Sequence, residues 1–215
     1  ISHCEDLSII NGGIINQGKI SEQLGVKGMD RLSEDSITQR EIDLARETGC
    51  PVHIAHVSTA GAVEAVRQAK AAGVKVTCET CPHYFMLTEK ELLKRDADYR
   101  MNPPLREETD RIAVEQGVLD GTIDCIVTDH APHSAGEKAN FETAPNGVVG
   151  LETSLAATLT ALYHTGKLSL QDIVRLMSKA PAKLLKIEGG VLKEGATADL
   201  ALVDLDELWT VEPEK

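Results

Sequence analysis

Short apolar runs alternate with amphipathic stretches along most of the chain. Three runs rich in β-branched residues predict strands, at residues 50–58, 74–80 and 123–129. Apolar residues at helical spacing predict helices at residues 59–73, 88–95, 106–121, 150–166 and 169–187. We expect Pro181 to break the last helix, because proline lacks the backbone N–H that an interior turn needs.

The order of these elements predicts an α/β fold with a parallel sheet covered by helices. Folds of this class carry their chemistry on the loops that follow the carboxyl ends of the strands. Residues 16–35 are polar and contain glycines, so we expect a loop there. Residues 189–215 contain closely spaced glycines and the strand-like sequence "ADLALVDL", which predicts a β appendage and divides the chain into domains at 1–188 and 189–215.

Composition narrows the classes of function. The 215 residues carry a formal net charge of −12, which argues against a nucleic-acid partner or an anionic membrane surface, since both need clustered Lys and Arg. No apolar run reaches the roughly 18 residues of a membrane span. Five dispersed cysteines are typical of reduced thiols, so we expect a cytoplasmic protein. The first ten residues lack a signal-peptide pattern and begin abruptly, as a segment of a longer protein would.

Three polar residues stand where loops should follow strands: His3, His56 and Asp129. Imidazole and carboxylate are the ligands of a catalytic zinc ion that keeps one position open for water. Each of these residues taken alone is more often a hydrogen-bonded structural group than a ligand, so both interpretations stay open from the residues themselves. His53 lies three residues before His56 in one predicted strand, and the two should face opposite sides.

The sequence "CETC" at residues 78–81 has the spacing of a redox or zinc motif. A redox role requires the motif at a helix N-terminus, and a zinc ribbon requires a second cysteine pair. Here the motif spans a predicted strand and its exit, and Cys125 stands alone. We therefore interpret these cysteines as structural.

The motifs taken together resemble one family. "SHCED", "HIAHVST", "CETCPHYF", "MNPPLR", "TDHAPH", "PNGVVGLET" and "GGVLKEGATADLALVDLD" occur in the order and at the spacing found in dihydroorotases, and "TDHAPH" with "NPPLR" is the most selective pair. The resemblance is to the bacterial type related to hydantoinases and allantoinases, within the amidohydrolase superfamily. It implies a TIM-like (β/α)8 barrel with a binuclear zinc centre and a small β-sandwich domain built from both chain ends.

The resemblance also implies roles for seven positions. His3 and His56 resemble the metal ligands after strands five and six, and Asp129 resembles the strand-eight aspartate that binds metal and shuttles protons. The other four resemble substrate-binding positions, namely the side chains of Asn102 and His133 and the backbone at Asn146 and Gly147.

Two features of the family are missing. The chain has no H-x-H pair, which supplies the first metal ligands after strand one, and no bridging ligand from strand four. Residues 1–188 therefore resemble the C-terminal half of the barrel, and residues 189–215 resemble the C-terminal part of the β domain. We expect this segment to be inactive on its own, because it holds too few ligands for two zinc ions.

The reaction implied is the reversible hydrolysis of dihydroorotate to N-carbamoyl-aspartate, a step in pyrimidine synthesis. A related cyclic amidohydrolase, such as a hydantoinase, dihydropyrimidinase or allantoinase, is the first alternative. A non-catalytic scaffold subunit of aspartate transcarbamoylase is the second. The resemblance implies a homodimer, an association with aspartate transcarbamoylase and a small-molecule substrate. From the net charge and the lack of a long apolar run, we expect neither a nucleic-acid nor a membrane partner.

Overall fold

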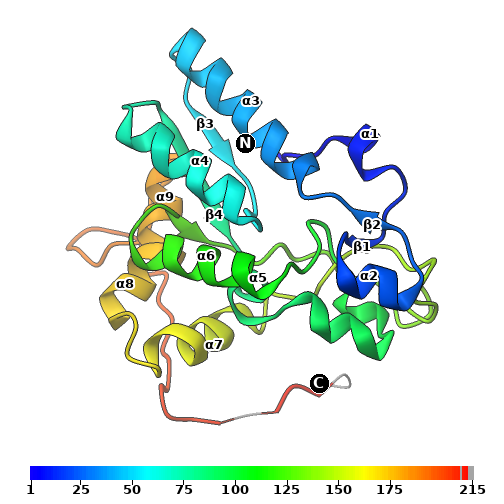
Figure 1. Ribbon diagram of the computed structural model, residues 1–215. Helices are drawn as coiled ribbons and strands as arrows, with labels where there is room; N and C mark the ends of the chain where they lie inside the picture. The colour runs from blue at the N-terminus through cyan, green and yellow to red at the C-terminus, as the bar shows by residue number, and fades with distance from the viewer. Residues whose placement is uncertain (209, 213–215) are drawn as a thin grey trace.

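A computed structural model of the protein describes residues 1–208 and 210–212 (Figure 1). Its main sheet has three parallel strands in the order β3–β4–β5: β3 (Val52–Ile54), β4 (Val76–Thr80) and β5 (Cys125–Ile126). Ser2 forms a parallel bridge to Ile54 at the outer edge of β3 and places the N-terminus beside that strand. The three predicted strands are confirmed, although β5 is shorter than its apolar run.

Helices connect the strands and cover one side of the sheet. α4 (Ala60–Ala71) begins at Thr59, whose side chain accepts a hydrogen bond from the Ala62 N–H and caps the helix. The helix predicted at residues 106–121 is α6 (Glu108–Leu119), which packs beside α4. Apolar residues of both helices join those of the strands in the main hydrophobic core, and this burial fixes the helices on the sheet.

The N-terminal region corrects one prediction, because residues 16–35 are not a loop. Two short parallel strands pair there, and Gly13 and Gly28 allow their backbones to approach, since a Cβ on Gly13 would lie 2.4 Å from the Gly28 carbonyl oxygen. The elements of this region are α1 (Leu7–Ile10), β1 (Ile15–Asn16), α2 (Lys19–Leu24), β2 (Gly28–Met29) and α3 (Leu32–Thr48).

The long helix α3 was not predicted from the sequence. Its buried face mixes the apolar Ile37 and Ile42 with the polar Glu34 and Thr38, so no clear apolar stripe marks it. The polar residues of this face form buried contacts with neighbouring loops, described below. The helix therefore depends on tertiary contacts that a periodicity search does not detect.

The connection from β4 to α6 contains three short helices. They are α5 (Pro82–Met86) and the 3₁₀ helices η1 (Glu89–Lys94) and η2 (Ala97–Tyr99). The Thr88 side chain accepts a hydrogen bond from the Lys90 N–H and caps η1, which lies within the helix predicted at residues 88–95.

The C-terminal helices combine α and π turns. The predicted break at Pro181 takes a milder form, because the chain stays helical while its hydrogen bonding changes from a π turn to an α turn. Pro181 lies in the first turn of the new α segment, where its missing N–H is not needed. These elements are α7 (Ser154–Thr158), η3 (Leu159–Tyr163), α8 (Leu170–Val174), η4 (Arg175–Lys179) and α9 (Ala180–Leu185).

The tail does not form the predicted strand. Within residues 189–208 and 210–212 the structure contains neither helix nor strand, and "ADLALVDL" is an irregular, mostly exposed segment. A β sandwich requires partner strands, and the described residues supply none to this segment. The domain boundary between residues 188 and 189 stays a prediction, and residues 209 and 213–215 of that domain lie outside the described residues.

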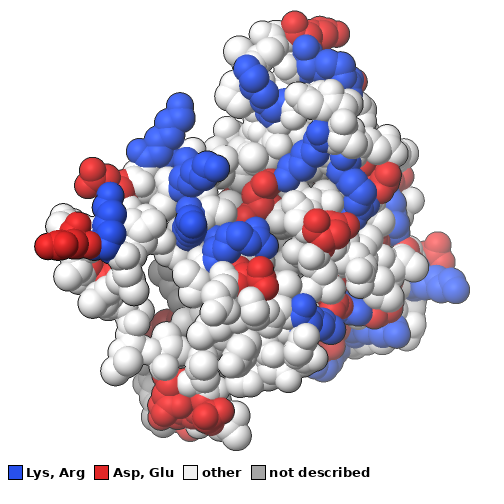
Figure 2. Space-filling model, turned by 90° about the vertical axis from the view of Figure 1, so that its left-hand side faces the viewer, with Lys and Arg blue, Asp and Glu red and all other residues white. Residues whose placement is uncertain are grey.

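The surface carries charges of both signs. On the face shown in Figure 2, Lys and Arg side chains are interspersed with Asp and Glu side chains. Within the described part of the chain, no helix is both long and apolar enough to cross a membrane.

Candidate active site

The parallel strands bring the predicted ligands to one edge of the sheet. His3 follows the bridge at Ser2, His56 follows β3, and Asp129 follows β5. Backbone hydrogen bonds fix the first two segments, since the Ala55 N–H donates to the Ser2 carbonyl oxygen at 3.0 Å. The carboxyl ends of parallel strands share an edge, so all three residues lie on the same side of the fold.

His3 and His56 are in direct contact. The Nδ1 atom of His3 lies 2.7 Å from the Nε2 atom of His56, and their rings meet edge to face. The backbone of His56 is left-handed, with φ of 36°, and that of Asp129 is also left-handed, with φ of 51°. Such a conformation costs a residue with a Cβ about 1–3 kcal/mol and is concentrated at functional sites, where surrounding contacts hold it.

The electrostatic setting of His56 favours its neutral form. Burial lowers the pKa of its imidazole, the nearby charge of Asp129 opposes that shift, and His3 reinforces it. The Nδ1 atom of His56 is buried without a hydrogen-bond partner. A neutral imidazole is the form that binds a metal ion.

Asp129 also has a second set of neighbours. Its carboxylate forms a compact cluster with Cys81 and His83, in which one potential ligand atom from each residue lies within 4.8 Å of the others. Burial lowers the pKa of His83 to about 3, with a further contribution from His56. Sequence reasoning missed His83 as a site residue and treated Cys81 as structural, although both lie just after β4, where a functional loop is expected.

Glu5 connects a predicted metal ligand to a predicted substrate residue. The Asn102 amide donates to one carboxylate oxygen of Glu5 at 2.6 Å, and the other oxygen lies 3.4 Å from Nε2 of His3. Nδ1 of His3 faces His56 at the same time. The Glu5 carboxylate therefore orients the His3 ring, and sequence reasoning did not identify this role.

The other predicted substrate residues form a separate group. Nε2 of His133 lies 3.1 Å from the Asn146 carbonyl oxygen, and the Gly147 N–H donates to the Arg100 carbonyl oxygen at 3.0 Å. A Cβ on Gly147 would lie 2.2 Å from the Ala131 carbonyl oxygen, so only glycine fits there. The structure brings His133, Asn146 and Gly147 together, and it places Asn102 with Glu5 instead.

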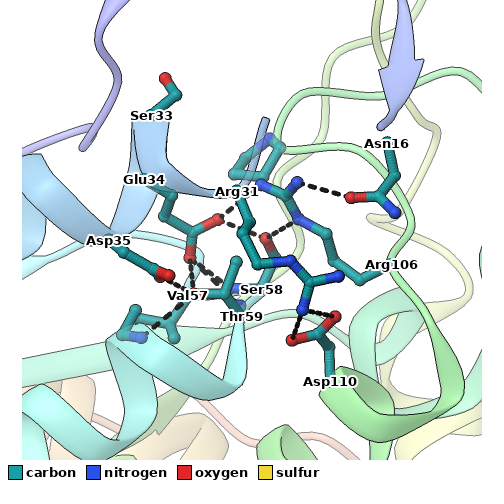
Figure 3. Close-up of polar contacts among 12 residues, drawn as sticks. Asn16, Arg31, Ser33, Glu34, Asp35, Val57, Ser58, Thr59, Arg106 and Asp110 are labelled. Carbon is teal, nitrogen blue, oxygen red and sulfur yellow. Dashed lines mark hydrogen bonds and ion pairs between the residues drawn. The ribbon is translucent and has the colours of Figure 1, made fainter. Parts of the chain in front are cut away.

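A buried ionic network holds the loop that follows His56 (Figure 3). The Glu34 carboxylate accepts hydrogen bonds from the N–H groups of Ser58 and Thr59 at 2.8 and 3.3 Å, and from the Ser58 hydroxyl. Arg106 pairs with Glu34 at 3.1 Å, and it also donates to the Ser58 hydroxyl at 3.0 Å and to the Asn16 side chain at 2.9 Å. Arg106 and Glu34 are almost fully buried.

This network joins segments that are distant in the sequence. Arg106 ends the "NPPLR" segment that carries Asn102, while Ser58 lies two residues after His56. Arg31 and the buried Asp110 form a second ion pair at 3.1 Å beside the network, as Figure 3 shows. The relative position of the metal-side and substrate-side loops is therefore fixed by buried charge pairs.

Comparison with known proteins identifies the class. Residues 15–214 match the amidohydrolase family, so the chain belongs to that family. A dihydroorotase of Trichlorobacter lovleyi is 50% identical over 98% of this chain and 50% of its own length. A dihydroorotase of Citrifermentans bemidjiense is 49% identical over 100% of this chain and 51% of its own length. The chain thus spans about half the length of the curated relatives it matches.

Solved structures show the same architecture. Dihydropyrimidinase from Brevibacillus agri matches with a TM-score of 0.80 at 27% identity, over 91% of this chain and 45% of that one. L-Hydantoinase from Arthrobacter aurescens also matches with a TM-score of 0.80, at 30% identity, over 91% of this chain and 46% of that one. The predicted fold, part of an amidohydrolase α/β barrel, is confirmed.

Proposed function

We propose that the chain is the C-terminal half of a dihydroorotase, which hydrolyses the ring amide of dihydroorotate reversibly to N-carbamoyl-aspartate. The observation that carries this proposal is the identity of about 50% over nearly the whole chain to relatives named dihydroorotase. The step belongs to pyrimidine synthesis, and we place the protein in the cytoplasm.

The donor set fits the zinc ions that the family implies. His3 and His56 direct ring nitrogens toward one another, His56 is held neutral by burial, and its Nδ1 atom has no other partner. His3, His56 and Asp129 would hold metal, and further ligands from the remaining half would complete two zinc sites. Bound zinc would supply Lewis acidity toward the amide carbonyl and toward water.

The residues of this chain perform the remaining tasks. The Asp129 carboxylate accepts the proton of the attacking water and delivers it to the ring nitrogen that leaves. Asn102 and His133 bind the substrate, and the backbone at Asn146 and Gly147 contacts the dihydropyrimidine ring. Glu5 keeps His3 and Asn102 in a fixed relation through its two carboxylate oxygens.

The two alternative functions, a related cyclic amidohydrolase and a non-catalytic scaffold subunit, have less support. Hydantoin and allantoin lack the ring carboxylate of dihydroorotate, and relatives acting on them usually lack counterparts of Asn102 and His133. A scaffold subunit of aspartate transcarbamoylase would tend to lose metal ligands, whereas His3, His56 and Asp129 are all present. We keep the homodimer and the association with aspartate transcarbamoylase as proposals.

The substrate-binding roles predict a specific kinetic result. We expect Asn102→Ala and His133→Ala, made in a full-length protein that joins this chain to the remaining half, to lower kcat/KM for dihydroorotate about ten- to hundredfold. Loss of one hydrogen bond to a charged group costs about 1.5–3 kcal/mol. Zinc content, measured by elemental analysis, should stay at the wild-type level, and His164→Ala on an exposed helix end serves as the control. A loss of zinc in either variant would contradict the substrate assignment.

The position of Glu5 predicts an effect on the metal. Glu5→Gln keeps the size of the side chain but removes the negative charge beside His3. We expect zinc affinity, measured by competition with a chelator, to fall by about 10–100-fold, the usual effect of removing a partner that orients a metal-binding histidine. Glu22→Gln on α2 is the matched control. An unchanged affinity would show that Glu5 does not orient His3.

A further inference from the structure

The cluster of Cys81, His83 and Asp129 is not explained by the proposed reaction, which uses only Asp129. Cys81 is fully buried, His83 is 8% exposed, and Asp129 is partly exposed. Cys81 is the N-cap of α5 and His83 lies in that helix, which follows β4, while Asp129 follows β5. Pairing of β4 with β5 therefore brings the residues together.

We propose that Cys81, His83 and Asp129 form a binding site for a thiophilic divalent cation such as Zn²⁺ or Cd²⁺, beside the His3–His56 pair. Sulfur, imidazole nitrogen and carboxylate oxygen are the donors that Zn²⁺ accepts in proteins, and a thiolate selects against Mg²⁺ and Ca²⁺.

The geometry requires only small movements. The three potential ligand atoms lie within 4.8 Å of one another. Around zinc, with bonds of about 2.0–2.3 Å, tetrahedral ligand atoms stand roughly 3.3–3.8 Å apart. Side-chain rotations that draw the atoms together by about 1 Å would complete the site, and a fourth position would remain for water or for a residue of the remaining half.

His83 supplies an independent observation. Its Nε2 atom is buried without a hydrogen-bond partner. An unpaired buried polar atom costs about 1–3 kcal/mol, and a cation held by this imidazole would remove that cost. This unpartnered nitrogen is the position at which a neutral imidazole offers a lone pair to a metal ion.

Binding exchanges a proton for the metal. The Cys81 thiol loses its proton to solvent as the sulfur–metal bond forms, and the His83 and Asp129 donors bind without further proton loss. Burial raises the pKa of the Cys81 thiol, so the bare thiolate is disfavoured and the cation must displace the proton. Asp129 is the one member of the cluster that is partly exposed to solvent.

A cation at this site would impair proton transfer by Asp129, and this consequence rests on the proposed function. A second cation on the Asp129 carboxylate, in addition to the catalytic zinc that this residue would hold, occupies the carboxylate oxygen that must accept the proton. We therefore expect this site to be inhibitory, so that excess thiophilic metal lowers turnover without displacing the catalytic zinc ions.

The test is a Cd²⁺ titration of the zinc-loaded full-length protein, followed by the ultraviolet charge-transfer absorption of a thiolate–Cd²⁺ bond. We expect one equivalent of absorption that disappears in Cys81→Ala and is retained in Cys78→Ala. Cys78 is the matched control, because it is equally buried in the same motif but contacts the Thr122 carbonyl oxygen instead. His83→Gln should weaken Cd²⁺ binding by at least about tenfold, the effect that even an outer partner of a metal site has.

Cys81→Ser, checked for native circular dichroism, replaces Cys81→Ala if the alanine variant does not fold. Absorption that survives in a folded Cys81 variant, or that never develops in the wild-type protein, would overturn the proposal. The titration needs no substrate, so it gives its result even if the protein does not hydrolyse dihydroorotate. Inhibition by Cd²⁺ that is relieved in Cys81→Ala would support the inhibitory role, and equal inhibition of both proteins would refute it.

Discussion

Asp129→Asn in the full-length protein is expected to reduce turnover of dihydroorotate by about 10²–10⁴-fold, the contribution typical of a positioned acid–base group. An amide oxygen can still approach a metal ion, but the amide cannot accept the proton of water and return it to a ring nitrogen. The left-handed backbone of Asp129 does not hinder the change, because asparagine tolerates this conformation better than most residues.

The measurement is steady-state turnover together with zinc content. Asp43→Asn on the exposed part of α3 is the control, and it should leave both unchanged. If Asp129→Asn retains turnover near the wild-type rate while keeping its zinc, Asp129 is not the proton carrier.

Arg106→Ala is expected to destabilise the protein by about 3–5 kcal/mol, because it leaves the Glu34 carboxylate buried without its ionic partner. The same change removes donors to Ser58 and Asn16, which adds unsatisfied buried groups. The loop after His56 depends on Glu34, so zinc affinity should fall together with stability.

Denaturant unfolding of the full-length protein measures this effect. Arg46→Ala breaks an exposed ion pair with Asp43 on the same helix as Glu34, and it should cost less than about 1 kcal/mol. A loss below about 1 kcal/mol for Arg106→Ala would show that the network of Figure 3 does not hold the site loops.

The sheet could be predicted because its signals are local. Apolar runs marked β3, β4 and β5, and Thr59 and Thr88 marked the starts of helices. The helix α3 could not be predicted, because part of its buried face is polar and is paired only in the folded protein. In the tail, by contrast, a local strand-like pattern is present but no strand forms. Such a strand needs partner strands, and the described residues contain none for it.

In the candidate site, too, some residues were marked by local sequence signals, and others depend on contacts made only in the folded protein. His3 follows the bridge at Ser2 and His56 follows β3, so their positions in the sequence marked them as candidates for one edge of the sheet, whereas their direct contact is seen only in the structure. Glu5 could not be assigned, because its partners His3 and Asn102 lie two and 97 positions away along the chain and meet only in three dimensions. Arg106 was part of a recognised motif, but its buried contacts with Glu34 and Asn16 come from separate elements. The roles of Asn102, His133 and Asp129 rest on the family resemblance, and they stay predictions.

We propose that this chain is the C-terminal half of a dihydroorotase and carries residues that select its substrate. The most direct measurement compares kcat/KM of the full-length zinc-loaded protein for dihydroorotate, dihydrouracil, hydantoin and allantoin. We expect dihydroorotate to be preferred by at least about 10²-fold, because a site built to bind its carboxylate leaves polar groups unpaired around the other substrates. Faster hydrolysis of hydantoin, dihydrouracil or allantoin, or no hydrolysis of any of the four, would contradict the claim.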